Sequence, residues 1–200
     1  SQIGFEKSGA SFDTVEAIAF TQLRPDHSAD LPAYIGAAQS DTREQRLTIM
    51  GPTGDGAANP STRELIERLF GPQGVYPYLA DAFKPRSSLG YRVRSIDVPA
   101  SGSKRWARYQ TERVKMTAIP VHHGEIPALA WRIEIDGQSV VITGSFNNSK
   151  NLVASFAQDA DALVVSHAIP ENSRGVLRDL YARPSQLGRI ADQAEARMMI

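Results

Sequence analysis

The fold of this chain is decided by the stretch Phe20-Thr21-Gln22-Leu23-Arg24-Pro25-Asp26-His27-Ser28-Ala29-Asp30-Leu31-Pro32. Residues 15–21, which lead into it, form a short apolar run rich in β-branched residues and predict a strand. Ser28 can cap a following helix, in which Leu31 and Ile35 fall on one face. The stretch therefore predicts a strand end, a tight turn and a helix start. An Asp-His pair at such a turn is a common place to hold a metal ion or a reacting water.

Strand and helix patterns alternate along the rest of the chain. Further strands are expected at residues 47–50, 91–98, 113–121, 128–135, 139–143 and 162–166. Helices are expected at residues 62–70, 76–83, 151–157 and 185–196. The capping-box spacing of Ser61 and Glu64 starts the first of these helices, and Asp136-Gly137 is a two-residue hairpin turn. This interleaving predicts an α/β fold in which the central segment forms an antiparallel meander.

The composition is that of a globular protein with no strong bias toward one kind of partner. The 200 residues contain 22 Lys plus Arg and 22 Asp plus Glu, so the net charge gives no nucleic-acid signature and no attraction to a membrane. No apolar run approaches the roughly 20 residues that span a bilayer, and no signal peptide is visible. We expect a soluble protein, either cytoplasmic or exported with its signal removed. The chain has no cysteine, which excludes thiolate nucleophiles and cysteine metal sites.

The four histidines each lie where a predicted strand ends: His27, His122, His123 and His167. Neutral imidazole is a common zinc ligand, and loops at strand ends hold ligands on a rigid frame. A single histidine at such a place is more often structural, but three such places in one small chain favour a shared site.

The stretch at residues 20–32 closely resembles the signature turn of the metallo-β-lactamase superfamily, T-H-x-H-x-D-H followed by D-L-P. Thr21, Asp26 and His27 match this pattern, as does Asp30-Leu31-Pro32. Gln22 and Arg24 stand where the family has its two leading histidines.

Later segments resemble the ribonuclease Z and arylsulfatase-like branch of the same superfamily. Gly51-Pro52-Thr53-Gly54 is similar to its G-P-x-G turn, and residues 119–134 are similar to V-x-H-G-x-x-P-A-x-A-Y-R-I-E, which makes His123 the counterpart of a zinc-binding histidine. Residues 140–146, 161–168 and 180–191 resemble three more family segments. The resemblance implies an αββα sandwich that lacks its first strands here. It also implies a single domain over residues 1–200, trimmed at both ends.

The departures from the family pattern decide which site residues we expect. Ser145 stands where the family has a metal-bridging aspartate, and Tyr181 stands at a histidine position. A metal would lower the pKa of bound water and so make the nucleophile, but glutamine is a poor zinc ligand and arginine repels a cation. The guanidinium of Arg24 could instead occupy the cation site and pair with Asp26.

The remaining candidates form a reduced site. The metal candidates are Asp26, His27 and His123, which would hold at most one zinc ion, and Asp26 is also the candidate catalytic base. Arg24, His122 and His167 are the candidate substrate-binding residues.

Two functions stay open from the sequence. The first is a hydrolase homologue with an incomplete zinc site, which binds no cofactor if the site is degenerate and serves as a binding or subunit-pairing module. The alternative is a remodelled mononuclear-metal hydrolase that acts on a phosphodiester, a sulfate ester or a lactone-like substrate. In either case a small-molecule or anionic ester ligand is expected, and a homo-oligomer is compatible with the sequence.

Overall fold

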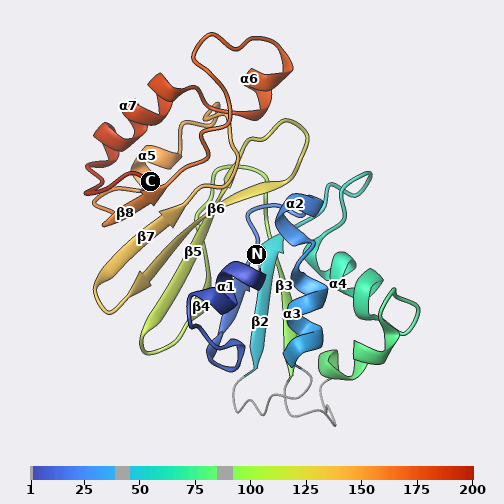
Figure 1. Cartoon of the computed structure of the whole chain (residues 1–200). Coiled ribbons are helices and arrows are strands. Elements are labelled where there is room, and N and C mark those ends of the chain that lie inside the picture. Colours follow the sequence, from blue (N-terminus) through green and yellow to red (C-terminus); the bar gives the residue numbers. More distant parts are fainter. Residues whose placement is uncertain (1, 39–45, 85–91) are drawn as a thin grey trace.

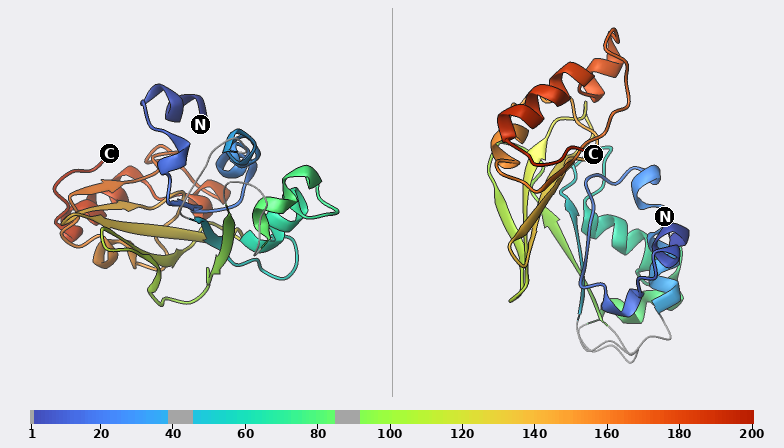
Figure 2. Two further views of the ribbon diagram at one scale, coloured as in Figure 1. Left: turned by 90° about the horizontal axis from the view of Figure 1, so that it is seen from below. Right: turned by 60° about the vertical axis from the view of Figure 1, so that its left-hand side comes forward.

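Two β-sheets face each other, with helices on the outer side of each sheet (Figure 1). The computed structural model describes residues 2–38, 46–84 and 92–200. Figure 2 shows the same arrangement from the edge, with the two sheets in the middle and helices on both outer sides. This order of layers confirms the predicted αββα sandwich.

The first sheet consists of three parallel strands in the order β1-β2-β3. These strands are β1 (Ala17–Ala19), β2 (Leu47–Pro52) and β3 (Val93–Val98). Every residue of the central strand β2 is buried, which explains why the strand contains no charged residue. The helices between these strands are α2 (Pro25–Ser28), α3 (Leu31–Ala37), α4 (Thr62–Phe70) and the 3-10 helix η3 (Pro77–Phe83), and β1 is preceded by α1 (Gln2–Lys7) and η1 (Phe12–Thr14).

The second sheet has five strands in the order β4-β5-β6-β7-β8. Its strands are β4 (Trp106–Gln110), β5 (Val114–Val121), β6 (Ala128–Ile135), β7 (Gln138–Ile142) and β8 (Ala162–Val164). The first four strands form an antiparallel meander, and β8 joins β7 in parallel. The remaining helices are α5 (Val153–Phe156), α6 (Val176–Leu180) and α7 (Pro184–Ala194).

Three apolar clusters hold these layers together. One packs α5 and α7 on the outer face of the second sheet, and another packs α3 and α4 on the outer face of the first sheet. The third lies between the sheets and includes Met50, Met116 and Trp131. The indole Nε1 of Trp131 donates a hydrogen bond of 2.9 Å to the carbonyl of Phe20, so the core is tied to the end of β1, where the decisive turn begins.

Several local expectations are confirmed and others need correction. The capping box at Ser61 and Glu64 is formed in both directions. Strand β3 was expected in the antiparallel meander but lies parallel to β2, because the chain returns through α4 and η3 before it. Ser28 does not cap α3: it is the last residue of α2, and its hydroxyl donates to the carbonyls of Leu23 and Arg24.

Helix α6 and the short helices η1 and α2 were not expected from the sequence, whereas β4 overlaps the basic residues 104–108, which favoured a solvated strand or hairpin. Strand β4 alternates only weakly because most of its side chains are partly or fully exposed. In the described ranges, no helix is long and apolar enough to cross a membrane.

Candidate functional site

The turn after β1 is fastened to both sheets. The amide of Phe20 donates to Met50 of β2, and the amide of Leu129 in β6 donates to the carbonyl of Thr21 at 2.8 Å. Gly144, which follows β7, has a φ of +58°, and a Cβ atom there would lie 2.6 Å from Cβ of Thr21. Only glycine therefore allows the chain after β7 to approach the turn this closely.

Four consecutive polar contacts organise the turn itself. Nε2 of His27 lies 2.6 Å from Nε2 of Gln22, and Nδ1 of His27 lies 3.3 Å from the hydroxyl of Thr21. Oδ1 of Asp26 pairs with Nε of Arg24 at 3.2 Å, while its Oδ2 lies 3.6 Å from His27. The expected pairing of Arg24 with Asp26 is thus present. Gln22 contacts His27 and Arg24 contacts Asp26, and both His27 and Asp26 match the signature turn that the sequence resembles.

His123 approaches the same turn from the end of β5. Its side chain is fully buried, its Nδ1 lies 2.7 Å from the carbonyl of Leu180, and its ring meets the Tyr181 ring edge-on. A carbonyl only accepts hydrogen bonds, so Nδ1 carries the proton and Nε2 carries a lone pair. Burial lowers the pKa of His123, against the opposing effect of the Leu180 carbonyl, and the cation of Arg24 lowers it further. These effects favour the neutral form of His123, whose Nε2 is buried.

Two buried acceptor atoms near this turn lack hydrogen-bond partners in the described part of the chain. They are Nε2 of His123 and Oε1 of Gln22, whose residues are 0% and 1% exposed. Buried acceptors usually find a donor, because leaving one unpaired costs about 1–3 kcal/mol. These atoms mark where a donor or a cation would be stabilised.

The other candidate residues lie farther from this group or in different surroundings. His122 points from the same loop as His123, but its Nε2 lies 3.3 Å from Oδ1 of Asp179. His167 is exposed in the segment after β8. Ser145, at the position of the family's bridging aspartate, is buried beside Gly144. The structure thus brings Arg24, Asp26, His27 and His123 together at one end of the sandwich.

The residues present do not fit a two-metal centre. Over residues 2–38, 46–84 and 92–200, no group of three or more His, Asp or Glu side chains is arranged to hold a metal ion. Both ring nitrogens of His27 already contact protein atoms, and the carboxylate of Asp26 faces a guanidinium. Among the three candidate ligands, Nε2 of His123 is a buried nitrogen with a lone pair and no hydrogen-bond partner in the described part of the chain.

Two small cavities flank the loop between β5 and β6. The first, which we call the Arg24 cleft, has a volume of about 190 Å³ and is lined by Arg24, Asn59 and an apolar wall of Leu23, Pro25, Pro52, Pro60, Ile126 and Pro127. The second, which we call the Lys150 cavity, has a volume of about 220 Å³ and includes Thr53, Ser101, His122, Glu125 and Lys150. Ile126 and Pro127 line both cavities.

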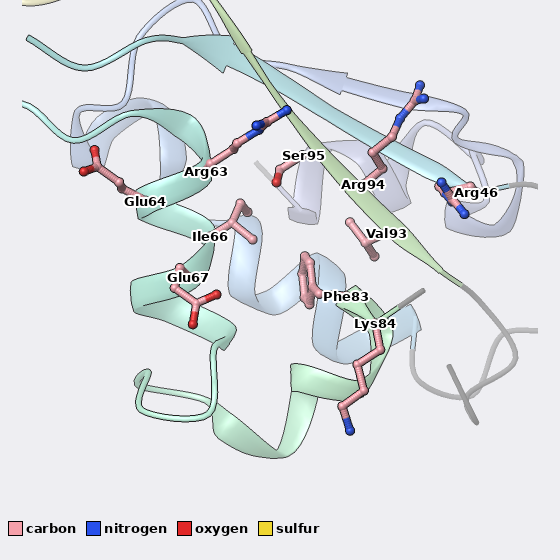
Figure 3. A pocket seen from close by; sticks show the side chains of 10 residues that line it. All are labelled: Arg46, Arg63, Glu64, Ile66, Glu67, Phe83, Lys84, Val93, Arg94 and Ser95. Atoms are coloured by element: carbon pink, nitrogen blue, oxygen red, sulfur yellow. The ribbon is translucent and has the colours of Figure 1, made fainter. Parts of the chain in front are cut away.

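A larger cavity of about 540 Å³ lies away from the histidines, between α4 and β3 (Figure 3). Figure 3 shows Ile66, Phe83 and Val93 gathered between the helix and the strand. Two of its charged residues pair with neighbours, Arg63 with Asp97 and Lys84 with Asp81. No histidine is among the described residues that line this cavity.

Sequence reasoning missed two residues of this region. Gln22 was treated as a lost ligand, but it is the hydrogen-bond partner of His27. Lys150 was not singled out, although it lines the cavity beside His122. The signal for Gln22 was its place in the metal-binding pattern, whereas Lys150 sits in a loop with no motif.

Two curated proteins are similar to this chain in sequence, and both are named ribonuclease Z. No family model matches the chain. Ribonuclease Z of Pediococcus pentosaceus is 24% identical over 220 aligned residues, covering 93% of this chain and 69% of that protein. Ribonuclease Z of Lachnospira eligens is 26% identical over 132 residues, covering 60% of this chain and 42% of that protein. The chain thus matches less than half of one curated relative and about two thirds of the other.

Solved structures give the same fold. The short form of human tRNase Z superposes with a TM-score of 0.74 at 16% identity, covering 99% of this chain and 76% of that one. The metallo-β-lactamase fold protein YhfI from Bacillus subtilis superposes with a TM-score of 0.65 at 16% identity, covering 98% of this chain and 68% of that one. These matches show the fold, and the two sequence relatives support the ribonuclease Z branch within it.

Proposed function

With the metallo-β-lactamase fold and the ribonuclease Z branch as the premise, we propose that this chain keeps a hydrolase scaffold but does not assemble the dinuclear zinc centre. Its site instead binds an anionic ester through Arg24. The contact that carries this proposal is the ion pair between Nε of Arg24 and Oδ1 of Asp26 at 3.2 Å. A guanidinium fixed beside the carboxylate supplies the positive charge that a metal would otherwise supply.

The surroundings of Arg24 support an anion as the ligand. Its side chain is 41% exposed and lines the Arg24 cleft, whose other walls are mostly apolar. A guanidinium has five donors, and the ion pair with Asp26 uses only the Nε edge, so the outer edge can meet a phosphate or carboxylate in a bidentate manner. The two sequence relatives are ribonucleases by name, so RNA belongs among the anionic esters to be tested.

Metal content tests this proposal directly. Zinc per chain is measured by plasma mass spectrometry on protein purified without chelator, equilibrated with zinc and freed of excess. We expect well below one zinc per chain for the natural sequence. We expect a clear gain when Gln22→His, Arg24→His and Ser145→Asp are combined, because these changes restore ligands at the family positions. One zinc per natural chain, lost on His123→Ala, would contradict the proposal.

The alternative is a mononuclear-metal hydrolase that uses Asp26, His27 and His123. One observation favours it: the inward lone pair of His123 Nε2 has no partner among the described residues. In this case Asp26 would exchange its contact with Arg24 for the metal, which would supply an activated water. Hydrolysis of a generic phosphodiester that is abolished by EDTA and restored by zinc would support this alternative over the binding role.

A further inference from the structure

Four loops line the Lys150 cavity, at the same end of the sandwich as His123. Thr53 and Asp55 come from the loop after β2, and Ser101 comes from the segment after β3. Glu125 lies between β5 and β6, and Lys150 follows β7. The cavity is therefore built by segments distant in sequence, each held at a strand end.

Lys150 carries a positive charge that the protein only partly satisfies. Its Nζ donates to the carbonyl of Gly102 at 3.2 Å, and its side chain is partly buried. Burial lowers the pKa of Lys150, and no charged neighbour contributes to that shift. A partly dehydrated ammonium with one carbonyl acceptor has two further N–H donors and a charge that an anion would stabilise.

Neutral donors lie beside this ammonium. The hydroxyl oxygen of Thr53 accepts from the amide of Ala100 at 3.2 Å, which leaves its hydrogen to be donated elsewhere. The exposed hydroxyl of Ser101 lines the same cavity. An ammonium together with hydroxyl donors is a suitable environment for the oxygen atoms of a phosphate group.

The two carboxylates that line the cavity differ in availability. Asp55 is bound within its own loop: its oxygens accept from the amides of Ala57 and Asn59 and from the side-chain amide of Asn59. These hydrogen bonds lower the pKa of Asp55 to about 2. Glu125 is exposed at the cavity, where it would repel a bare anion and accept hydrogen bonds from hydroxyl groups attached to one.

We propose that the Lys150 cavity binds the phosphate group of a hydroxyl-bearing phosphate ester such as a ribose phosphate. The phosphate lies against the ammonium of Lys150, and a hydroxyl group of the ligand reaches Glu125. The cavity contains none of the Arg24, Asp26, His27 and His123 side chains, so the proposal goes beyond the function proposed above and does not require a metal. The ribose phosphate can belong to a free mononucleotide or to the end of an RNA chain.

Isothermal titration calorimetry with adenosine 5′-monophosphate tests the proposal. We expect binding by the natural chain, none of comparable strength for adenosine, and a weaker response to inorganic phosphate. Lys150→Gln removes the charge and should weaken nucleotide binding about tenfold or more, because a charge-assisted hydrogen bond is lost. Lys150→Arg should retain most of the affinity. Lys115→Gln is the matched control, because Lys115 pairs with Glu134 on the sheet, away from the cavity.

Two results would overturn the proposal. One is the absence of any heat of binding at millimolar nucleotide. The other is unchanged affinity in Lys150→Gln with loss of affinity in Arg24→Gln, which would place the ligand in the Arg24 cleft and leave the proposed function intact. A short 5′-phosphorylated RNA serves as the second arm: tighter binding than the mononucleotide, still dependent on Lys150, identifies an RNA end, and equal binding identifies the mononucleotide.

Discussion

Replacement of Trp131 by phenylalanine tests how the core supports the site turn. Trp131 is 1% exposed in the cluster between the two sheets. Its Nε1 donates a hydrogen bond of 2.9 Å to the carbonyl of Phe20, which directly precedes the turn that carries Gln22 and His27. Trp131→Phe keeps an aromatic ring but removes this donor and leaves the carbonyl buried.

The expected loss of stability has two parts. A buried carbonyl left without its donor costs about 1–3 kcal/mol. The smaller ring also leaves unfilled space, which adds roughly 1 kcal/mol. The sum is about 2–4 kcal/mol of unfolding free energy, and for a chain of this length it lowers Tm by about 5–15 °C.

Urea and thermal unfolding followed by far-UV circular dichroism measure this loss. The control is Trp106→Phe, because Nε1 of Trp106 is buried and has no hydrogen-bond partner among the described residues. Removal of that unsatisfied donor should cost less than about 1 kcal/mol, although the ring contacts with Lys104 and Arg108 weaken. Equal destabilisation by the two variants would refute the assigned role of the Trp131 hydrogen bond.

Three further measurements follow from the same structure. Gly144→Ala and Gly102→Ala both place a side chain at positive φ, but of the two only the one at position 144 would meet another residue. The Tm of Gly144→Ala should therefore fall further than that of Gly102→Ala. Equal Tm shifts would contradict the close approach of Gly144 to Thr21. Burial and the hydrogen bond to Glu16 raise the pKa of Tyr109 to about 12. The contribution of this hydrogen bond to stability is therefore present below pH 10 and lost as the pH rises through 12. An ultraviolet titration should show a tyrosine that ionises late, and Tyr109→Phe should remove this late phase. A titration without such a phase would argue against the shift. Hydrogen bonding from the backbone lowers the pKa of Asp161. Asp161→Asn should therefore lose less unfolding free energy than the natural chain as the pH falls below about 4. The same pH dependence of unfolding free energy in both proteins would count against this contact.

Much of the fold could be read from local patterns. The burial of all of β2 agrees with its apolar run, and the capping box at Ser61 fixed the start of α4. The place of β3 could not be read in this way, because a strand pattern does not say which sheet the strand joins. Weak alternation left the bounds of β4 undefined, because its residues are partly or fully exposed at the edge of the second sheet.

The candidate site likewise has features that the sequence shows and features that only the tertiary structure shows. The sequence alone placed Gln22, Arg24 and Ser145 at positions where the family that the chain resembles has metal ligands, because residue identity at a motif position needs no coordinates. Only the tertiary structure decided that Gln22 contacts His27 and that His123 is buried with its acceptor nitrogen unpaired. His123 and the turn that carries Gln22 and His27 lie at strand ends that are about 100 residues apart in the chain. Their geometry depends on how the two sheets pack, which no local pattern specifies.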